Sequence, residues 1–345
     1  MIRQNFNADW TVEKGDGNSR MNSFLGNTQT KTVHLPYDAM IHEARTPDTK
    51  NGAQTGFYPG GEYIFQKHFT APQAWQGKPV SLVFEGVYQT ALVYLNGWLL
   101  TRNVNGYAEF TVEVGPYLKY GADNLLKVIA DNSLEPNSRW YTGSGIYRPV
   151  RLLVGNKVYL PQDTVCITTR EVGEGFALLD VTAQVQSAST VTERVILQQT
   201  ICREGTAVLT DRQNLLLQPG ESRTVSFRYC VDSPALWSPE DPNLYTSILQ
   251  VLEGEEELDR EETSFGIRTL SIDAAHGVRI NGQTVKLRGA CIHHDNGILG
   301  AATLPDAEER RIRQLKEAGF NAIRSSHHPA GRALLDACDR YGVLV

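Results

Sequence analysis

The chain has 345 residues, of which 41% are apolar and 21% are charged, and its formal net charge is −6. This composition is that of a soluble globular protein and excludes a disordered or membrane protein. The mildly acidic balance gives no electrostatic reason to expect a nucleic-acid partner. No apolar run follows the first residues, so no signal peptide is expected, and no run reaches the ~18–20 apolar residues that span a bilayer, so no membrane partner is expected.

The five cysteines are widely separated, and none forms a C-x-x-C pair. An odd, scattered set of this kind is typical of reduced thiols. The sequence therefore predicts a cytoplasmic protein.

Residues 1–160 have the pattern of an antiparallel β-sandwich. Apolar residues alternate with other residues in the segments 80–84 and 91–95, which is the period of a strand with one buried face. Asn96-Gly97 follows at once and is a strong hairpin signal, because both residues tolerate positive φ. Short apolar runs separated by Gly, Pro and Asn continue to the end of the segment. We predict an antiparallel sandwich of jelly-roll type for residues 1–160.

A second β-rich segment covers residues 161–270, and Pro161 is interpreted as part of a linker. Apolar residues alternate from Ala177 to Val185, and the pattern recurs around Phe227. About 110 residues of short strands without a long helical pattern predict an immunoglobulin-like β-sandwich.

The last segment, residues 271–345, alternates between strand and helix patterns. A hairpin signal at Asn281-Gly282 precedes three short apolar runs that are separated by two helical patterns. Thr303 and Asp306 have the spacing of a capping box at the start of the first helix. Strands that alternate with helices pair in parallel through right-handed crossovers. Because three such strands do not complete a parallel sheet with both faces covered, we interpret this segment as the truncated start of a (β/α)8 TIM barrel.

Polar side chains cluster where the first two barrel strands end. In a TIM barrel the active site lies at this end of the strands. Imidazole and guanidinium groups donate directional hydrogen bonds to sugar hydroxyls, so the cluster predicts a site for a polyhydroxylated ligand. The cluster contains His293, His294, Asp295, Asn296, Arg324, Ser325, Ser326, His327 and His328.

Two other interpretations of this cluster remain open. In the first interpretation, some of the histidines are core or loop residues whose hydrogen bonds are formed within the protein. In the second, a metal is bound by His293, Asp295, His327 and His328, although no H-x-H or H-E-x-x-H spacing supports it.

Glycoside hydrolysis requires a pair of carboxylates, and Asp295 is the only acid at a visible strand end.

Four stretches of the chain form long motifs: Gly143–Val150, Leu236–Tyr245, Arg288–Asp295 and Asn321–Pro329, the last continuing through Asp339 to Val345. Together they resemble glycoside hydrolase family 2, the family of β-galactosidases, β-glucuronidases and β-mannosidases, and they occur in that family's domain order. The resemblance implies a sugar-binding jelly-roll domain, an immunoglobulin-like domain and a barrel.

The resemblance implies that His293, Arg324 and His327 line the sugar subsite, and Asp295 is added to the predicted substrate-binding set. The family's acid/base and nucleophile are glutamates on later barrel strands. They are expected beyond Val345, so no catalytic residue is predicted here and the chain alone is expected to be inactive.

Two positions depart from the family pattern. His328 stands where the family usually has tyrosine, and Arg139-Trp140-Tyr141 stands where some β-galactosidases carry an aspartate that helps to hold the sugar. Trp140 fits sugar stacking and domain packing equally well. We expect Arg148 to pair with an acid between domains.

The predicted function is that of a retaining β-glycosidase, first of all a β-galactosidase, with β-glucuronidase and β-mannosidase as alternatives. A non-catalytic carbohydrate-binding module and a structural scaffold are the alternatives from other classes. The expected partner is a carbohydrate substrate, and a homo-oligomer is an option. No cofactor is predicted in this chain, and the use of Mg²⁺ or Na⁺ by the complete enzyme stays open.

Overall fold

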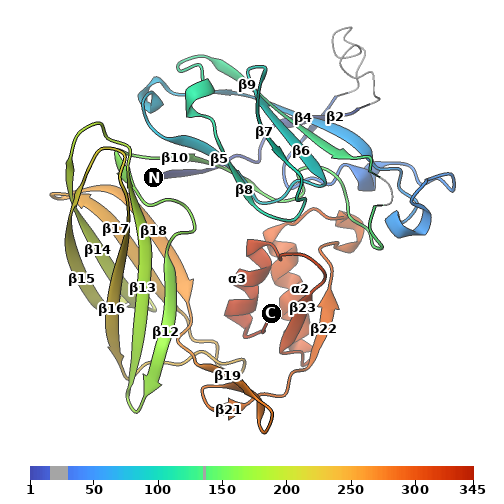
Figure 1. Ribbon diagram of the computed structural model, residues 1–345. Coiled ribbons are helices and arrows are strands. Elements are labelled where there is room, and N and C mark those ends of the chain that lie inside the picture. The colour runs from blue at the N-terminus through green and yellow to red at the C-terminus, as the bar shows by residue number, and fades with distance from the viewer. Residues whose placement is uncertain (16–29, 135–136) are drawn as a thin grey trace.

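The computed structural model describes residues 1–15, 30–134 and 137–345 (Figure 1). It confirms the predicted fold class, with two β-sandwiches followed by the opening strands and helices of a barrel. No helix in these described ranges is long and apolar enough to cross a membrane.

The N-terminal sandwich has a six-stranded sheet and a four-stranded sheet, and all strand pairs within them are antiparallel. Short 3-10 helices lie in its connections, at Met40–His42, Gly52–Thr55, Gln73–Trp75 and Gly115–Tyr117. The larger sheet is ordered β3 (Lys31–Val33), β2 (Trp10–Lys14), β4 (Gly61–Thr70), β9 (Asp123–Asn132), β6 (Thr90–Leu95), β7 (Trp98–Asn103). The smaller sheet is ordered β1 (Ile2–Asn5), β10 (Val150–Val154), β5 (Val80–Phe84), β8 (Phe110–Glu113).

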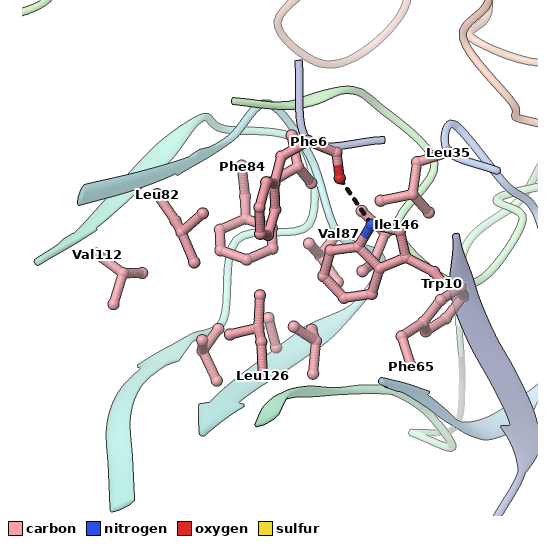
Figure 2. Packing of buried hydrophobic residues seen from close by; sticks show 14 of the residues in the cluster. Phe6, Trp10, Leu35, Phe65, Leu82, Phe84, Val87, Val112, Leu126 and Ile146 are labelled. Carbon is pink, nitrogen blue, oxygen red and sulfur yellow. Dashed lines mark hydrogen bonds between the residues drawn. The ribbon is translucent and has the colours of Figure 1, made fainter. Parts of the chain in front are cut away.

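The two sheets enclose one apolar core (Figure 2). Leu82 of β5 and Leu126 of β9 are fully buried in it. The indole N–H of Trp10 donates to the Phe6 carbonyl at 2.8 Å, which satisfies its one polar atom inside the core (Figure 2). The predicted hairpin joins β6 and β7, and both residues of Asn96-Gly97 have positive φ.

The second sandwich packs two four-stranded sheets around a separate core. Ala177, Leu179, Val181, Ala183 and Val185 are all buried, as their alternation predicts. Its first strand precedes Pro161 in the sequence. In one sheet, β13 (Phe176–Ser187) pairs with β11 (Val158–Tyr159), β12 (Cys166–Gly173) and β16 (Ser222–Asp232). The other is ordered β15 (Thr206–Leu217), β14 (Glu193–Arg203), β17 (Tyr245–Glu253), β18 (Glu256–Phe265).

The C-terminal segment begins with a small antiparallel sheet and continues as a parallel strand–helix unit. Leu344 forms a parallel bridge to Ala322, so a third barrel strand starts beside the second. The small sheet contains β19 (Leu270–Asp273), β20 (Gly277–Ile280) and β21 (Gln283–Thr284). The barrel part contains β22 (Gly289–Ile292), the 3-10 helix Gly297–Leu299, α2 (Pro305–Glu317), β23 (Ala322–Ser325) and α3 (Arg332–Tyr341).

The predicted capping box at the start of α2 is wrong. Leu304 is the N-cap residue and no side chain caps the helix. The Thr303 hydroxyl donates to the Ala301 carbonyl at 3.2 Å, while the Thr303 backbone N–H donates to the Tyr147 carbonyl at 2.9 Å. Contact with the N-terminal sandwich therefore fixes Thr303 before the helix begins.

Side chains from all three parts of the chain meet around the helices. Arg332 of α3 forms ion pairs with Glu109 of the first sandwich, at 2.9 Å, and with Asp163 of the second. The indole N–H of Trp237 in the second sandwich donates to the Asp339 carbonyl of α3 at 2.8 Å. These contacts hold the barrel strands in a fixed position against the N-terminal sandwich, below which they lie in Figure 1.

Candidate functional site

The ends of β22 and β23 bring four imidazoles together in two pairs. The strands are parallel, with Ile292 opposite Ser325, so the residues that follow them lie side by side. The His293 and His327 rings meet edge to face, with centroids 5.6 Å apart. The His294 and His328 rings do the same at 4.7 Å.

Arg324 determines which nitrogen of His327 carries the proton. A guanidinium nitrogen of Arg324 lies 3.2 Å from His327 Nδ1. Because guanidinium only donates, this Nδ1 is the acceptor and the proton of the neutral ring is on Nε2. His327 is exposed, so its Nε2–H is a donor that a hydroxyl group can reach.

His294 has a different environment, because it is 7% exposed. Its Nε2–H donates to the Thr142 carbonyl at 2.8 Å, and its Nδ1 lies 3.1 Å from His328 Nε2. Burial lowers the pKa of His294 to about 3, and burial is also the main cause of the lowered pKa of His328. Both rings are therefore neutral near pH 7. His294 is therefore a core histidine with hydrogen bonds inside the protein, as the first of the two other interpretations of the cluster expected.

The N-terminal sandwich supplies two aromatic rings to the cluster. The Tyr107 ring stacks on His328, with centroids 4.3 Å apart and planes inclined by 9°. The half-buried Trp140 lies 5.4 Å from the His293 ring and 5.3 Å from the His327 ring. Its indole N–H donates to the Tyr107 hydroxyl at 3.2 Å. No sequence pattern pointed to Tyr107, because only the docking of the domains places it there.

Arg148 connects the sandwich to the second strand end. Its guanidinium donates to the carbonyls of Tyr107 and Pro329, both at 2.8 Å, and lies over the Tyr147 ring at 5.2 Å. Among the residues that the structure describes, Arg148 forms no ion pair with an acid, so that expectation is wrong. Backbone carbonyls at the domain junction accept its hydrogen bonds instead.

Asp38 is a second connecting residue, and sequence reasoning did not identify it. The carboxylate is 1% exposed and lies between the sandwich and the loop that follows β22. Burial is the main cause of its raised pKa. The groups that donate to it are the Tyr141 hydroxyl at 2.6 Å and the backbone N–H groups of Met40, Ser144 and Ala301 at 2.8–3.0 Å.

Asp295 lies apart from the imidazole pairs in its interactions. Its side chain is exposed. Its backbone carbonyl accepts a hydrogen bond of 2.7 Å from Arg311 of α2, which also donates to the His293 carbonyl at 2.8 Å. In the ranges that the structure describes, no hydrogen bond joins the Asp295 carboxylate to His293, Arg324 or His327. No cluster of three or more potential metal ligands occurs in these ranges either.

Models of one enzyme family match the chain in three consecutive segments. Residues 10–151 match the glycosyl hydrolase 2 galactose-binding domain-like model, 159–268 the glycosyl hydrolases family 2 model, and 274–345 the TIM barrel domain of the same family. The chain belongs to glycoside hydrolase family 2. The family model for a barrel domain agrees with the parallel pair β22–β23 and its two helices.

Relatives in this family act on more than one sugar. The chain is 37% identical to the β-galactosidase BoGH2A of Bacteroides ovatus over 99% of its own length and 40% of that protein. It is 31% identical to a putative β-glucuronidase of Formosa agariphila over 100% of its own length and 32% of that protein. The crystal structure of a family 2 member from Bacteroides cellulosilyticus superposes with a TM-score of 0.94 at 35% identity, over 100% of this chain and 45% of that one. The chain thus spans less than half of each relative.

Proposed function

We propose that the protein to which this chain belongs is a retaining β-glycosidase, with terminal β-galactosides as its first candidate substrates. Family membership supports a glycosidase. The similarity to a β-galactosidase, at 37% identity, supports the choice of sugar. β-Glucuronidase is the second candidate, supported by the 31% identity to a putative β-glucuronidase.

The observation that carries the proposal is the pairing of His293 with His327 at the ends of neighbouring barrel strands. His327 presents an Nε2–H donor whose tautomer is set by Arg324. In the proposed complex, these groups donate to sugar hydroxyls, and the hydrogen bonds strengthen as charge develops on the sugar ring.

Hydrolysis itself requires two carboxylates on opposite sides of the glycosidic bond. We expect these to be the family's two glutamates, on barrel strands that follow Val345. Asp295 cannot replace both, because one carboxylate cannot protonate the leaving oxygen and attack from the other side. The 345-residue chain is therefore expected to be inactive alone.

The test is a turnover assay on this chain and on a chain extended through a complete barrel, using nitrophenyl β-galactoside, β-glucuronide and β-mannoside. We expect turnover by the extended chain only, and fastest with the galactoside. Preference for the glucuronide would replace the first candidate substrate by the second. No turnover of any of the three substrates by the extended chain would contradict the proposed function.

We also propose a cytoplasmic location. All five cysteines are free thiols, and Cys202 and Cys338 are buried without a disulfide partner. Cell fractionation with an antibody against the chain tests this location, and recovery from the periplasm or medium would contradict it. Homo-oligomer formation stays a prediction, which sedimentation of the extended chain would test.

A further inference from the structure

One segment of the N-terminal sandwich lies directly against the barrel strand ends. It begins at Trp140, whose ring contacts His293 and His327, and it includes Thr142, whose carbonyl accepts from His294. The candidate sugar site is therefore built from two domains. The segment supplies one aromatic side chain to it.

The environment of Trp140 differs from that of a core tryptophan. Trp10 and Trp237 are 0% and 1% exposed, whereas Trp140 is half-buried. Its ring lies against the imidazoles of His293 and His327, at centroid distances of 5.4 and 5.3 Å. A tryptophan whose role was only to fill a core would bury its whole ring against apolar partners.

The polar atom of Trp140 is already used within the protein. Indole has a single donor and no acceptor, and this N–H donates to the Tyr107 hydroxyl at 3.2 Å. What Trp140 can still offer a ligand is therefore apolar ring contact and not a further hydrogen bond. Binding pockets commonly combine such contact with a few directed polar groups, which here are the neighbouring imidazoles.

We propose that Trp140 is a sugar-binding residue that stacks on the apolar face of the pyranose held by His293 and His327, and that Tyr107 is its positioning residue. This inference rests on the proposed function. Tyr107 is itself held by stacking on His328 and by the Arg148 guanidinium, which donates to its carbonyl. The orientation of the indole is thus determined by both domains.

Kinetics of the chain extended through a complete barrel test the proposal. Stacking and apolar contact predict that Trp140→Ala lowers kcat/KM by about 10- to 100-fold, mostly through KM, because this contact is present in both ground and transition states. Trp140→Phe keeps a smaller ring and should recover part of the loss. Tyr107→Phe keeps the stacking on His328 but loses the hydrogen bond to the indole, so KM should rise by about 3- to 10-fold with little change in kcat.

The matched control is Trp98→Ala on the same sandwich, because Trp98 is 66% exposed on β7 and has no place in the site. This variant should keep the kinetics of the unmodified enzyme. If Trp140→Ala does not fold, the Trp140→Phe and Tyr107→Phe variants carry the test. Unchanged KM in the folded Trp140 variants of an active enzyme would overturn the inference and leave the proposed function intact. An unmodified enzyme without glycosidase activity would instead overturn the proposed function.

Discussion

The carboxylate of Asp38 accepts a hydrogen bond of 2.8 Å from the backbone N–H of Ala301, although 263 residues separate the two in the sequence. Ala301 follows the first barrel strand, and Asp38 belongs to the N-terminal sandwich. Gly300 has a φ of 59°, and a side chain there would meet the Asp38 carboxylate, so only glycine allows this close approach. The bond therefore fixes the loop that follows β22 to the sandwich.

Asp38→Ala is expected to destabilise the protein by about 3 kcal/mol. The substitution removes the shared acceptor and leaves several buried donors without a partner. Urea unfolding measures the free energy of unfolding. The control is Asp123→Ala, because the Asp123–His68 ion pair is exposed on the same sandwich and should contribute little. Equal destabilisation by the two variants would show that Asp38 has no special role.

Because His294 is buried, we expect the free energy of unfolding of the protein to depend on pH. Burial lowers its pKa in the folded chain to about 3, whereas the ordinary value is 6.5. Between these values the unfolded chain binds a proton that the folded chain does not, so the free energy of unfolding falls as pH falls, by about 1.4 kcal/mol per pH unit. His294→Gln should remove this contribution, about 2 kcal/mol between pH 6.5 and 5.

Urea unfolding of both proteins at pH 7 and pH 5 measures that difference. The exposed His276 provides the control variant, His276→Gln, which should retain the pH dependence of the unmodified protein. Parallel stability profiles for the unmodified protein and His294→Gln would show that His294 titrates normally in the folded chain.

Arg332 should contribute to the docking of the three parts of the chain. Arg332→Met removes its ion pairs with Glu109 and Asp163, which belong to the two sandwiches. These groups are partly exposed, so we expect a loss of only about 1 kcal/mol, which decreases as salt is added. Arg313→Met is the control, because its pair with Glu317 at 3.9 Å stays within α2. Thermal unfolding at low and high salt measures both effects, and a salt-independent difference would contradict an ionic role.

Local signals in the sequence were sufficient for much of the fold. Asn96-Gly97 and Asn281-Gly282 form hairpins because their backbones reach positive φ at low cost. The alternation from Ala177 to Val185 gives a strand with one buried face. Strand and helix periodicity likewise indicated the parallel barrel strands.

The composition of the candidate site was less accessible to sequence reasoning. His293, Arg324 and His327 were visible because the ends of parallel strands converge. Tyr107 and Asp38 were not, because their roles depend on how distant segments dock, as in the stacking of Tyr107 on His328 and the hydrogen bond from Ala301 to Asp38. For Trp140 the sequence does not distinguish packing from stacking, since it does not show whether an aromatic ring at a domain junction is fully buried.

The most direct test of the central claim is the effect of His327→Ala on kcat/KM in the chain extended through a complete barrel. A donor whose hydrogen bond strengthens in the transition state contributes up to about 2.7–4 kcal/mol, so kcat/KM should fall by about 10²- to 10³-fold. The exposed His327 side chain contributes little to packing, so thermal stability should hardly change. The control is His68→Ala, because His68 is an exposed histidine on the N-terminal sandwich, and this variant should leave kcat/KM unchanged. A His327→Ala enzyme with the same kcat/KM as the unmodified enzyme would contradict the assignment of this strand end to the sugar site.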